Sequence, residues 1–201
     1  MGKIKNTKNE LKAQRDALKR FKRYLPTLLL KKQQLQIEVR QLEFKIDAKK
    51  DEERQARKDL AVWVRLFSEP LDLSPWLSVS KIERTSGNIA GVNIPVLQQV
   101  VFRRETPDLY ATPAWVDEGL KTLEQLVRLR IERRILDEQL RLLADELRTT
   151  SQRVNLFEKV KIPESAENIR VIRIFLGDMD TAGVARAKIA KGKSLDKGVA
   201  A

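Results

Sequence analysis

The chain has 201 residues, of which 40 are basic and 28 acidic, so its formal net charge is +12 at pH 7. It contains no Cys and no His, which excludes disulfides and thiolate chemistry and removes the commonest metal ligand and general base. No apolar run approaches the ~20 residues that a membrane-spanning helix needs. We therefore expect a soluble, cytoplasmic protein with no catalytic, metal or cofactor site. Abundant charge with few aromatic residues is typical of long helices.

Residues 1–68 carry the first long helical pattern. From Leu11 to Phe67, alternate steps of three and four residues meet mostly apolar side chains, and this spacing persists for about eight heptads. Such a stripe predicts an N-terminal coiled-coil helix, which at ~1.5 Å per residue is about 85 Å long. The apolar seam expected in this helix comprises Leu18, Phe21, Leu25, Leu28, Leu35, Val39, Leu42 and Ile46.

Two features interrupt this stripe. From Lys49 to Glu53 the seam positions are charged, which indicates either a solvated section of helix or a seam left open for another chain. Pro26 lies inside the pattern, where a proline removes a backbone hydrogen bond and bends or breaks a helix. We favour the solvated section and the bend, with the open seam and the helix break as the alternatives.

The first helix is also strongly basic. Residues 1–68 hold 19 basic and 9 acidic side chains, so most of the excess positive charge lies at this end of the chain. Such a surface attracts an acidic partner, a phosphate backbone or a membrane surface, and its simplest interpretation is a solvated basic face. The side chains that we single out as candidate contacts are Lys8, Lys12, Arg15, Lys19 and Arg20.

Helical periodicity fails over residues 69–114, which form a candidate insert. This stretch holds five of the seven prolines and two glycines. Runs of β-favouring residues flank the glycines, one over residues 77–82 and the other over residues 89–102. The pattern predicts a small β-hairpin or an irregular β insert between two loops.

Three tryptophans, Trp63, Trp76 and Trp115, lie in or near the insert. A tryptophan combines a large apolar ring with one polar group, so it suits the edge of a core. We expect the three rings to pack the insert onto the helices, and the alternative is a docking surface for a partner protein.

Residues 115–180 carry a second helical stripe. Asp117 and Glu118 lie in its first turn, where acidic side chains suit the positive end of the helix dipole. The stripe slips beside Pro163, where a kink is expected. Residues 181–201 have no stripe and are expected to form a flexible basic tail. The apolar seam of the second arm comprises Leu136, Leu140, Leu143, Leu147, Val154, Ile169, Ile172 and Leu176.

The two arms have similar lengths and a compact insert joins them, so they must fold back on each other. The sequence therefore predicts an all-α protein, a long antiparallel two-helix coiled-coil hairpin with a small β-hairpin or irregular insert at the turn end. When the ends of both stripes are aligned, Pro26 lies opposite Phe157 and Pro163 lies opposite Arg20. The two prolines are then about 9 Å apart along the axis, which predicts a shared bend.

The segment 148–163, RTTSQRVNLFEKVKIP, resembles the C-terminal helix of the D subunit of the V-type and A-type ATPases. The Arg-Val-Asn run is its most specific part, and the ENIRVIRIFLGDMD that follows is also similar to that family. The basic opening of the first helix matches less specifically. The resemblance covers residues 4–67 and 115–180. The positions that carry the family motif are Arg153, Val154, Asn155, Glu158 and Pro163.

The resemblance implies a non-catalytic subunit of the central rotor stalk, peripheral to the membrane. The partners that it implies are the catalytic A and B subunits, the F subunit of the stalk, and the C (or d) subunit on the membrane side. The two terminal helices would enter the hexamer of A and B subunits, where Lys8, Lys12, Arg15, Lys19 and Arg20 would meet it. Turning the stalk couples ATP synthesis or hydrolysis to transport of H⁺ or Na⁺.

Two other functions compete with this interpretation. Basic helices also bind nucleic acids, although no zinc-finger, RRM or KH signature is present. A coiled-coil scaffold is the second alternative. An enzyme is the weakest candidate, because the sequence has neither a G-x-x-x-x-G-K-[ST] loop nor a G-x-S-x-G elbow.

Overall fold

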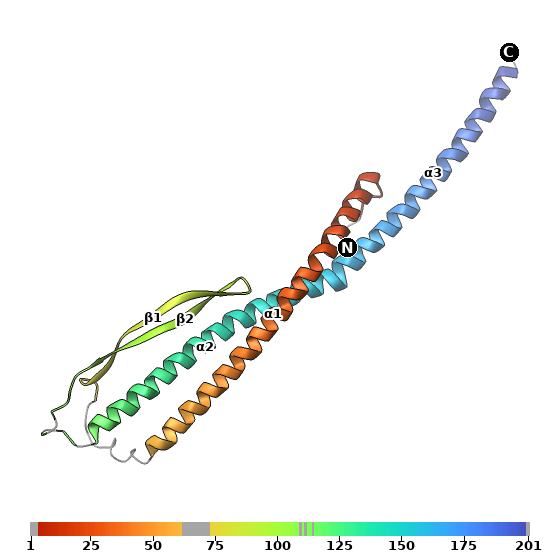
Figure 1. The fold of residues 1–201 in the computed structure, drawn as a ribbon. Helices are drawn as coiled ribbons and strands as arrows, with labels where there is room; N and C mark the ends of the chain where they lie inside the picture. Colours follow the sequence, from red (N-terminus) through yellow and green to blue (C-terminus); the bar gives the residue numbers. More distant parts are fainter. Residues whose placement is uncertain (1–3, 62–72, 109, 111, 114, 200–201) are drawn as a thin grey trace. The chain divides into compact units, whose positions relative to one another are not determined.

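The computed structural model describes residues 4–61, 73–108, 110, 112–113 and 115–199. It is mostly helical with one two-stranded antiparallel sheet (Figure 1). The chain forms two compact units, which we call the terminal unit (Met1–Leu30 with Thr150–Ala201) and the hairpin unit (Lys31–Thr149). The elements in chain order are α1 (Lys8–Ala61), β1 (Leu77–Ile89), β2 (Val92–Arg104), α2 (Val116–Leu156), the π-helical turn η2 (Phe157–Lys161) and α3 (Ile162–Val199).

The core of the hairpin unit lies where α1, α2 and the tip of the β-hairpin meet. Leu35 and Leu42 of α1, Ile94 of β2 and Leu143 of α2 form its buried centre. Heptad spacing puts Leu35 and Leu42 on one face of α1, so both reach α2. Half-buried neighbours surround this centre: Val39, Ile89, Ala90, Val92, Val96, Leu136, Leu140, Leu142 and Leu147.

The β-hairpin runs alongside α2 (Figure 1). Near its open end, Arg104 pairs with Asp117 at 2.7 Å. Towards its tip, the side-chain amide of Gln139 donates to the carbonyl oxygen of Pro95. The guanidinium of Arg128 lies 5.7 Å from the centre of the Phe102 ring, a cation–π contact between them. The predicted insert is therefore a docked hairpin.

The turn of the hairpin lies further along the chain than the sequence pattern indicated. Ile89 was expected in the second strand, but it ends β1 and pairs with Val92 across a two-residue turn. Ala90 and Gly91 have φ of 50° and 80°, the left-handed values that tight hairpins require. The side chain of Asn88 accepts a hydrogen bond of 3.0 Å from the Gly91 backbone N–H and so closes the turn.

A second small core lies at the base of the hairpin. Trp115, Val116 and Leu120 are buried together, and Leu73, Trp76 and Leu77 pack against them. The expectation that tryptophans pack the insert onto the helices is confirmed for Trp76 and Trp115. Trp63 lies outside the described residues.

In the terminal unit, the start of α1 packs against the C-terminal arm. The rings of Phe21 and Phe157 lie 5.2 Å apart between centroids. Phe157 therefore lies opposite Phe21, and the predicted register, which put it opposite Pro26, is wrong by more than one helical turn. The ends of the two apolar stripes do not define the relative level of the helices, whereas the aromatic contact fixes it directly.

The two prolines have different local consequences. α1 continues through Pro26 without interruption, so the alternative of a helix break is wrong. On the other arm, η2 ends at Lys161, two residues before Pro163, and the Ile162 N–H donates to the Phe157 carbonyl oxygen. A π turn widens the helix by one residue, which accommodates a proline ring that would clash with the preceding turn. A shared bend stays a prediction.

The helix of the C-terminal arm extends further than expected. Residues 181–201 were expected to be a flexible tail, whereas α3 continues to Val199. The segment is rich in Ala and Lys, which have high helix propensity, and this outweighs its few glycines. Within the described residues, no helix is both long and apolar enough to span a bilayer.

Candidate functional site

The predicted seam residues line the inner faces of the helices. None of the sixteen is exposed, and the most deeply buried are Leu35, Leu143 and Ile172, each with no accessible surface. Burial of such side chains contributes about 1.5–3 kcal/mol each. The sequence pattern missed a second buried face of α2, on which Ile135 and Gln139 lie. The tip of the neighbouring hairpin accounts for it, because Gln139 donates to the Pro95 carbonyl oxygen of β2.

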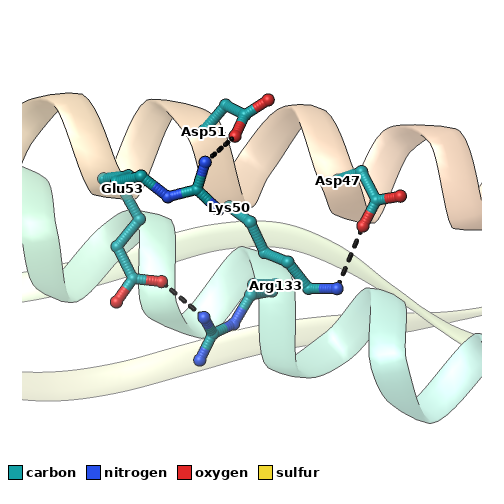
Figure 2. A network of polar contacts seen from close by, with 6 residues as sticks. Asp47, Lys50, Asp51, Glu53 and Arg133 are labelled. Carbon is teal, nitrogen blue, oxygen red and sulfur yellow. Dashed lines mark hydrogen bonds and ion pairs between the residues drawn. The ribbon is translucent and has the colours of Figure 1, made fainter.

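Charged residues cross the seam at one level of the hairpin unit. We call Lys49 and Glu53 of α1 with Glu132 and Arg133 of α2 the ionic layer. Glu53 accepts from Arg133 at 2.7 Å, and Lys49 lies 3.1 Å from Glu132. Figure 2 shows the Glu53 and Arg133 side chains directed toward each other from the two helices. The expectation of a solvated section at Lys49–Glu53 is therefore wrong for Glu53, because its side chain is only 6% exposed.

The ionic layer satisfies its buried carboxylate completely. The second oxygen of Glu53 accepts from Arg57, one turn further along α1, at 2.6 Å. Burying a carboxylate without such partners costs several kcal/mol, and the two guanidinium groups offset this cost for Glu53. Hydrogen bonds to Glu52 and then to Glu132 raise the pKa of Lys49 above its ordinary value. The layer is thus a matched set of opposite charges.

Beyond the ionic layer the seam is less tightly closed. A cavity of about 440 Å³ lies between the end of α1 and the start of α2. Its apolar lining includes Leu60 of α1 and Leu126 of α2, while Glu53 and Arg57 border it. The seam is therefore open at the level of Leu60 and Leu126, and not at the charged stretch Lys49–Glu53 where the open seam was considered.

The basic side chains at the start of α1 point away from the helix seam. Lys8, Lys12, Arg15, Lys19 and Arg20 are all exposed. Within the described part of the chain, none of the five forms an ion pair with an acidic side chain. Their charge is therefore available to an acidic surface outside the chain.

The motif around residues 153–163 divides between the seam and the surface. Val154 is 2% exposed and belongs to the seam, whereas Arg153, Asn155, Glu158 and Pro163 are exposed. Among the described residues, neither Arg153 nor Asn155 makes a side-chain hydrogen bond that would fix the register of the helices. Their exposure favours contacts outside the chain.

α3 exposes apolar side chains in both of its halves. Its largest exposed apolar residues are Ile174, Phe175 and Met179 in one stretch and Val184 and Ile189 further along. Contiguous exposed apolar surface is typical of contacts between proteins. Met179 continues the apolar stripe of the second arm, whereas Ile174 and Phe175 lie beside it. In the described parts, no group of acidic side chains is arranged to hold a metal ion.

Comparison with known proteins agrees with the motif and the helical seam. The family model for the D subunit of ATP synthase matches residues 10–192. The D subunit of the V-type ATP synthase of Borreliella burgdorferi is 47% identical over 197 residues, which is 98% of this chain and 98% of that protein. That of Chlamydia muridarum is 38% identical over 193 residues, with 94% and 95% of the two chains covered. The chain therefore belongs to the family of ATP synthase D subunits.

Proposed function

We propose that this protein is the central-stalk rotor subunit of a V/A-type ATPase. It transmits torque between the hexamer that processes ATP and the membrane rotor that moves H⁺ or Na⁺. Membership of the D-subunit family supports the assignment to such a complex. Its own role is mechanical, and its partner subunits bind the nucleotides.

The observation that carries the proposal is the asymmetric packing of the hairpin unit. Within the described residues, the β-hairpin covers α2, whereas one face of α1 stays exposed. In the hairpin unit, α1 and α2 pack through Leu35, Leu42 and Leu143, and close packing resists sliding under load. The β-hairpin lies against α2, whereas Ile37 and Phe44 on α1 remain 56% and 78% exposed. A shaft with such an asymmetric cross-section contacts each surrounding catalytic site through a different surface. These different contacts are what would let each site respond to the angle of the shaft.

The proposal includes an antiparallel pairing of α1 with α2 in the hairpin unit. The paired levels in the hairpin unit run in opposite directions: Lys31 meets Glu146, whereas Lys49 meets Glu132. Packed helices of this kind supply torsional stiffness.

We assign the ends of the chain to the hexamer of A and B subunits. The exposed basic side chains of early α1 would meet acidic loops through many contacts that are individually weak, so that the shaft can turn. The exposed apolar side chains of α3, such as Phe175 and Met179, would form the bearing surface. The F subunit and the membrane-side C (or d) subunit would bind the hairpin unit and its turn end.

A reconstituted complex tests the proposal. ATP hydrolysis and ion pumping are measured with the remaining subunits, with and without this chain. We expect ion pumping to disappear without the chain, while the hexamer retains hydrolysis that no longer responds to a block of ion flow. Pumping that continues without the chain, or tight binding of the free chain to nucleic acid with a steep salt dependence, would count for the scaffold or nucleic-acid alternatives.

A further inference from the structure

The apolar seam of the hairpin unit does not by itself select one alignment of its helices. Leu35 and Leu42 of α1 are seven residues apart, and so are Leu136 and Leu143 of α2. Sliding one helix by a heptad, about 10 Å, therefore again places leucine against leucine. Another feature must distinguish the observed alignment from the one a heptad away.

The ionic layer supplies that feature. Glu53 stands at a seam position of α1, Arg133 stands at a seam position of α2, and the two meet at 2.7 Å. A slide of one heptad would bring Glu53 to the level of Leu126 or Leu140 and leave it without a cation from the other helix. A carboxylate that is 6% exposed cannot gain the lost interaction from water.

The other ion pairs between the two helices cannot distinguish the observed alignment from the one a heptad away. Lys31 and Glu146 are 33% and 29% exposed, and Lys49 and Glu132 are 31% and 29% exposed. Ion pairs with this much access to water contribute little, because each charge is solvated when it is separated. Glu53 is the one deeply buried carboxylate among the residues that the structure describes, so the discrimination depends on it.

We infer that the Glu53–Arg133 pair selects the register of α1 against α2. The pair acts as a positioning element, in the way that a single buried polar residue specifies alignment in coiled coils. Its role concerns which alignment forms, and it does not depend on the proposed function of the protein. A pair that only stabilised the fold would leave the alignment unchanged when it is removed.

Disulfide trapping on the full-length chain tests this inference, because the chain has no native Cys. The native-register reporter is Lys31→Cys with Glu146→Cys, at a pair whose charged atoms are 2.6 Å apart. The shifted reporter is Glu38→Cys with Glu146→Cys, one heptad along α1. Each reporter is placed in the parent chain, in Glu53→Leu/Arg133→Leu, and in the control Asp51→Ala/Arg54→Ala, which removes an exposed pair within α1.

In the parent and the control, we expect the shifted reporter to oxidise at least about tenfold more slowly than the native one. In Glu53→Leu/Arg133→Leu, the two rates should approach each other, while circular dichroism shows unchanged helix content. A shifted reporter that stays slow in this folded variant would overturn the inference.

A second variant covers the case in which the double substitution unfolds the chain. Glu53→Gln keeps the size of the side chain and removes its charge, so Arg133 loses its carboxylate. We expect the shifted reporter to oxidise faster than in the parent chain, and an unchanged rate would overturn the inference equally.

Discussion

The ring of Phe21 packs against the ring of Phe157 at 5.2 Å between centroids, with the ring planes inclined by 42°. A tilted arrangement of this kind is favourable for aromatic pairs. It joins the first helix to the C-terminal arm at the start of the π turn. The contact therefore fixes the alignment of the terminal unit where the regular helix is interrupted.

Phe21→Ala should lower the free energy of unfolding by about 2 kcal/mol, less than for a fully buried Phe because this ring is half-buried. Urea unfolding of the full chain measures the change. Phe44→Ala is the matched control, since that ring is 78% exposed and its removal should cost less than about 0.5 kcal/mol. Equal costs for the two variants would contradict the contact.

The π turn accounts for the slip in the apolar stripe. A regular heptad that passes through Thr150 and Val154 continues to positions 164, 168 and 171. The buried residues are Ser165, Ile169 and Ile172, each one residue later. One additional residue in η2 supplies this offset.

Deleting Glu158 should remove the additional residue and leave the seam in phase. In a Pro163→Ala background, which avoids a proline clash in the regular helix, the deletion should change stability by no more than about 1 kcal/mol. Deleting Ala166 instead should cost more than about 2 kcal/mol, because it rotates Ile169 and Ile172 out of the seam. Thermal unfolding followed by circular dichroism measures both, and a reversed order would refute the explanation of the slip.

The pH dependence of stability should report the bonds of Lys49. Its pKa is raised in the folded chain, first by Glu52 and then by Glu132, so the folded state binds its proton more tightly than the unfolded state does. The resulting stability is complete below the unfolded pKa of about 10.4 and is lost as pH rises through the higher folded value. Lys49→Gln should therefore be less stable than the parent chain at pH 9, with the difference shrinking above pH of about 10.4. A constant difference would contradict the assignment.

The exposed basic side chains of early α1 should govern association with the hexamer electrostatically. Changing Lys8, Lys12, Arg15, Lys19 and Arg20 together to Gln should slow binding to an A and B hexamer by at least about tenfold at low salt. The rate should also become less sensitive to salt.

The matched control for this variant is Lys50→Gln with Arg54→Gln, which removes exposed positive charge from the hairpin unit. Stopped-flow measurements of association at several salt concentrations compare the two. If the control slows binding as much as the quintuple variant, the contact does not lie at the start of α1.

Heptad spacing predicted the seam well because its signal is repeated many times along each helix. It did not predict the ionic layer. In the sequence, Glu53 and Arg133 are charged residues in two separate apolar stripes, and only the structure shows that they meet. The hairpin was expected, but its turn lies later in the chain than the gap between the two β-favouring runs indicated. In the structure Gly87 lies within β1, where an added Cβ would come within 2.9 Å of the Val96 side chain.

The apolar stripe did not predict how far α3 extends. Residues after Met179 have no regular apolar spacing, yet their backbone is helical to Val199 because propensity alone supports it. The exposure of Arg153 and Asn155 could not be predicted either, since sequence gives their neighbours along the chain but not the direction of their side chains.

Observation of single complexes tests the rotor assignment most directly. With the A and B hexamer fixed to a surface, a bead is attached to a cysteine introduced at the exposed residue Asp51 of α1. We predict that ATP drives unidirectional stepwise rotation of the bead. A bead that stays stationary while the same complex hydrolyses ATP would contradict the account.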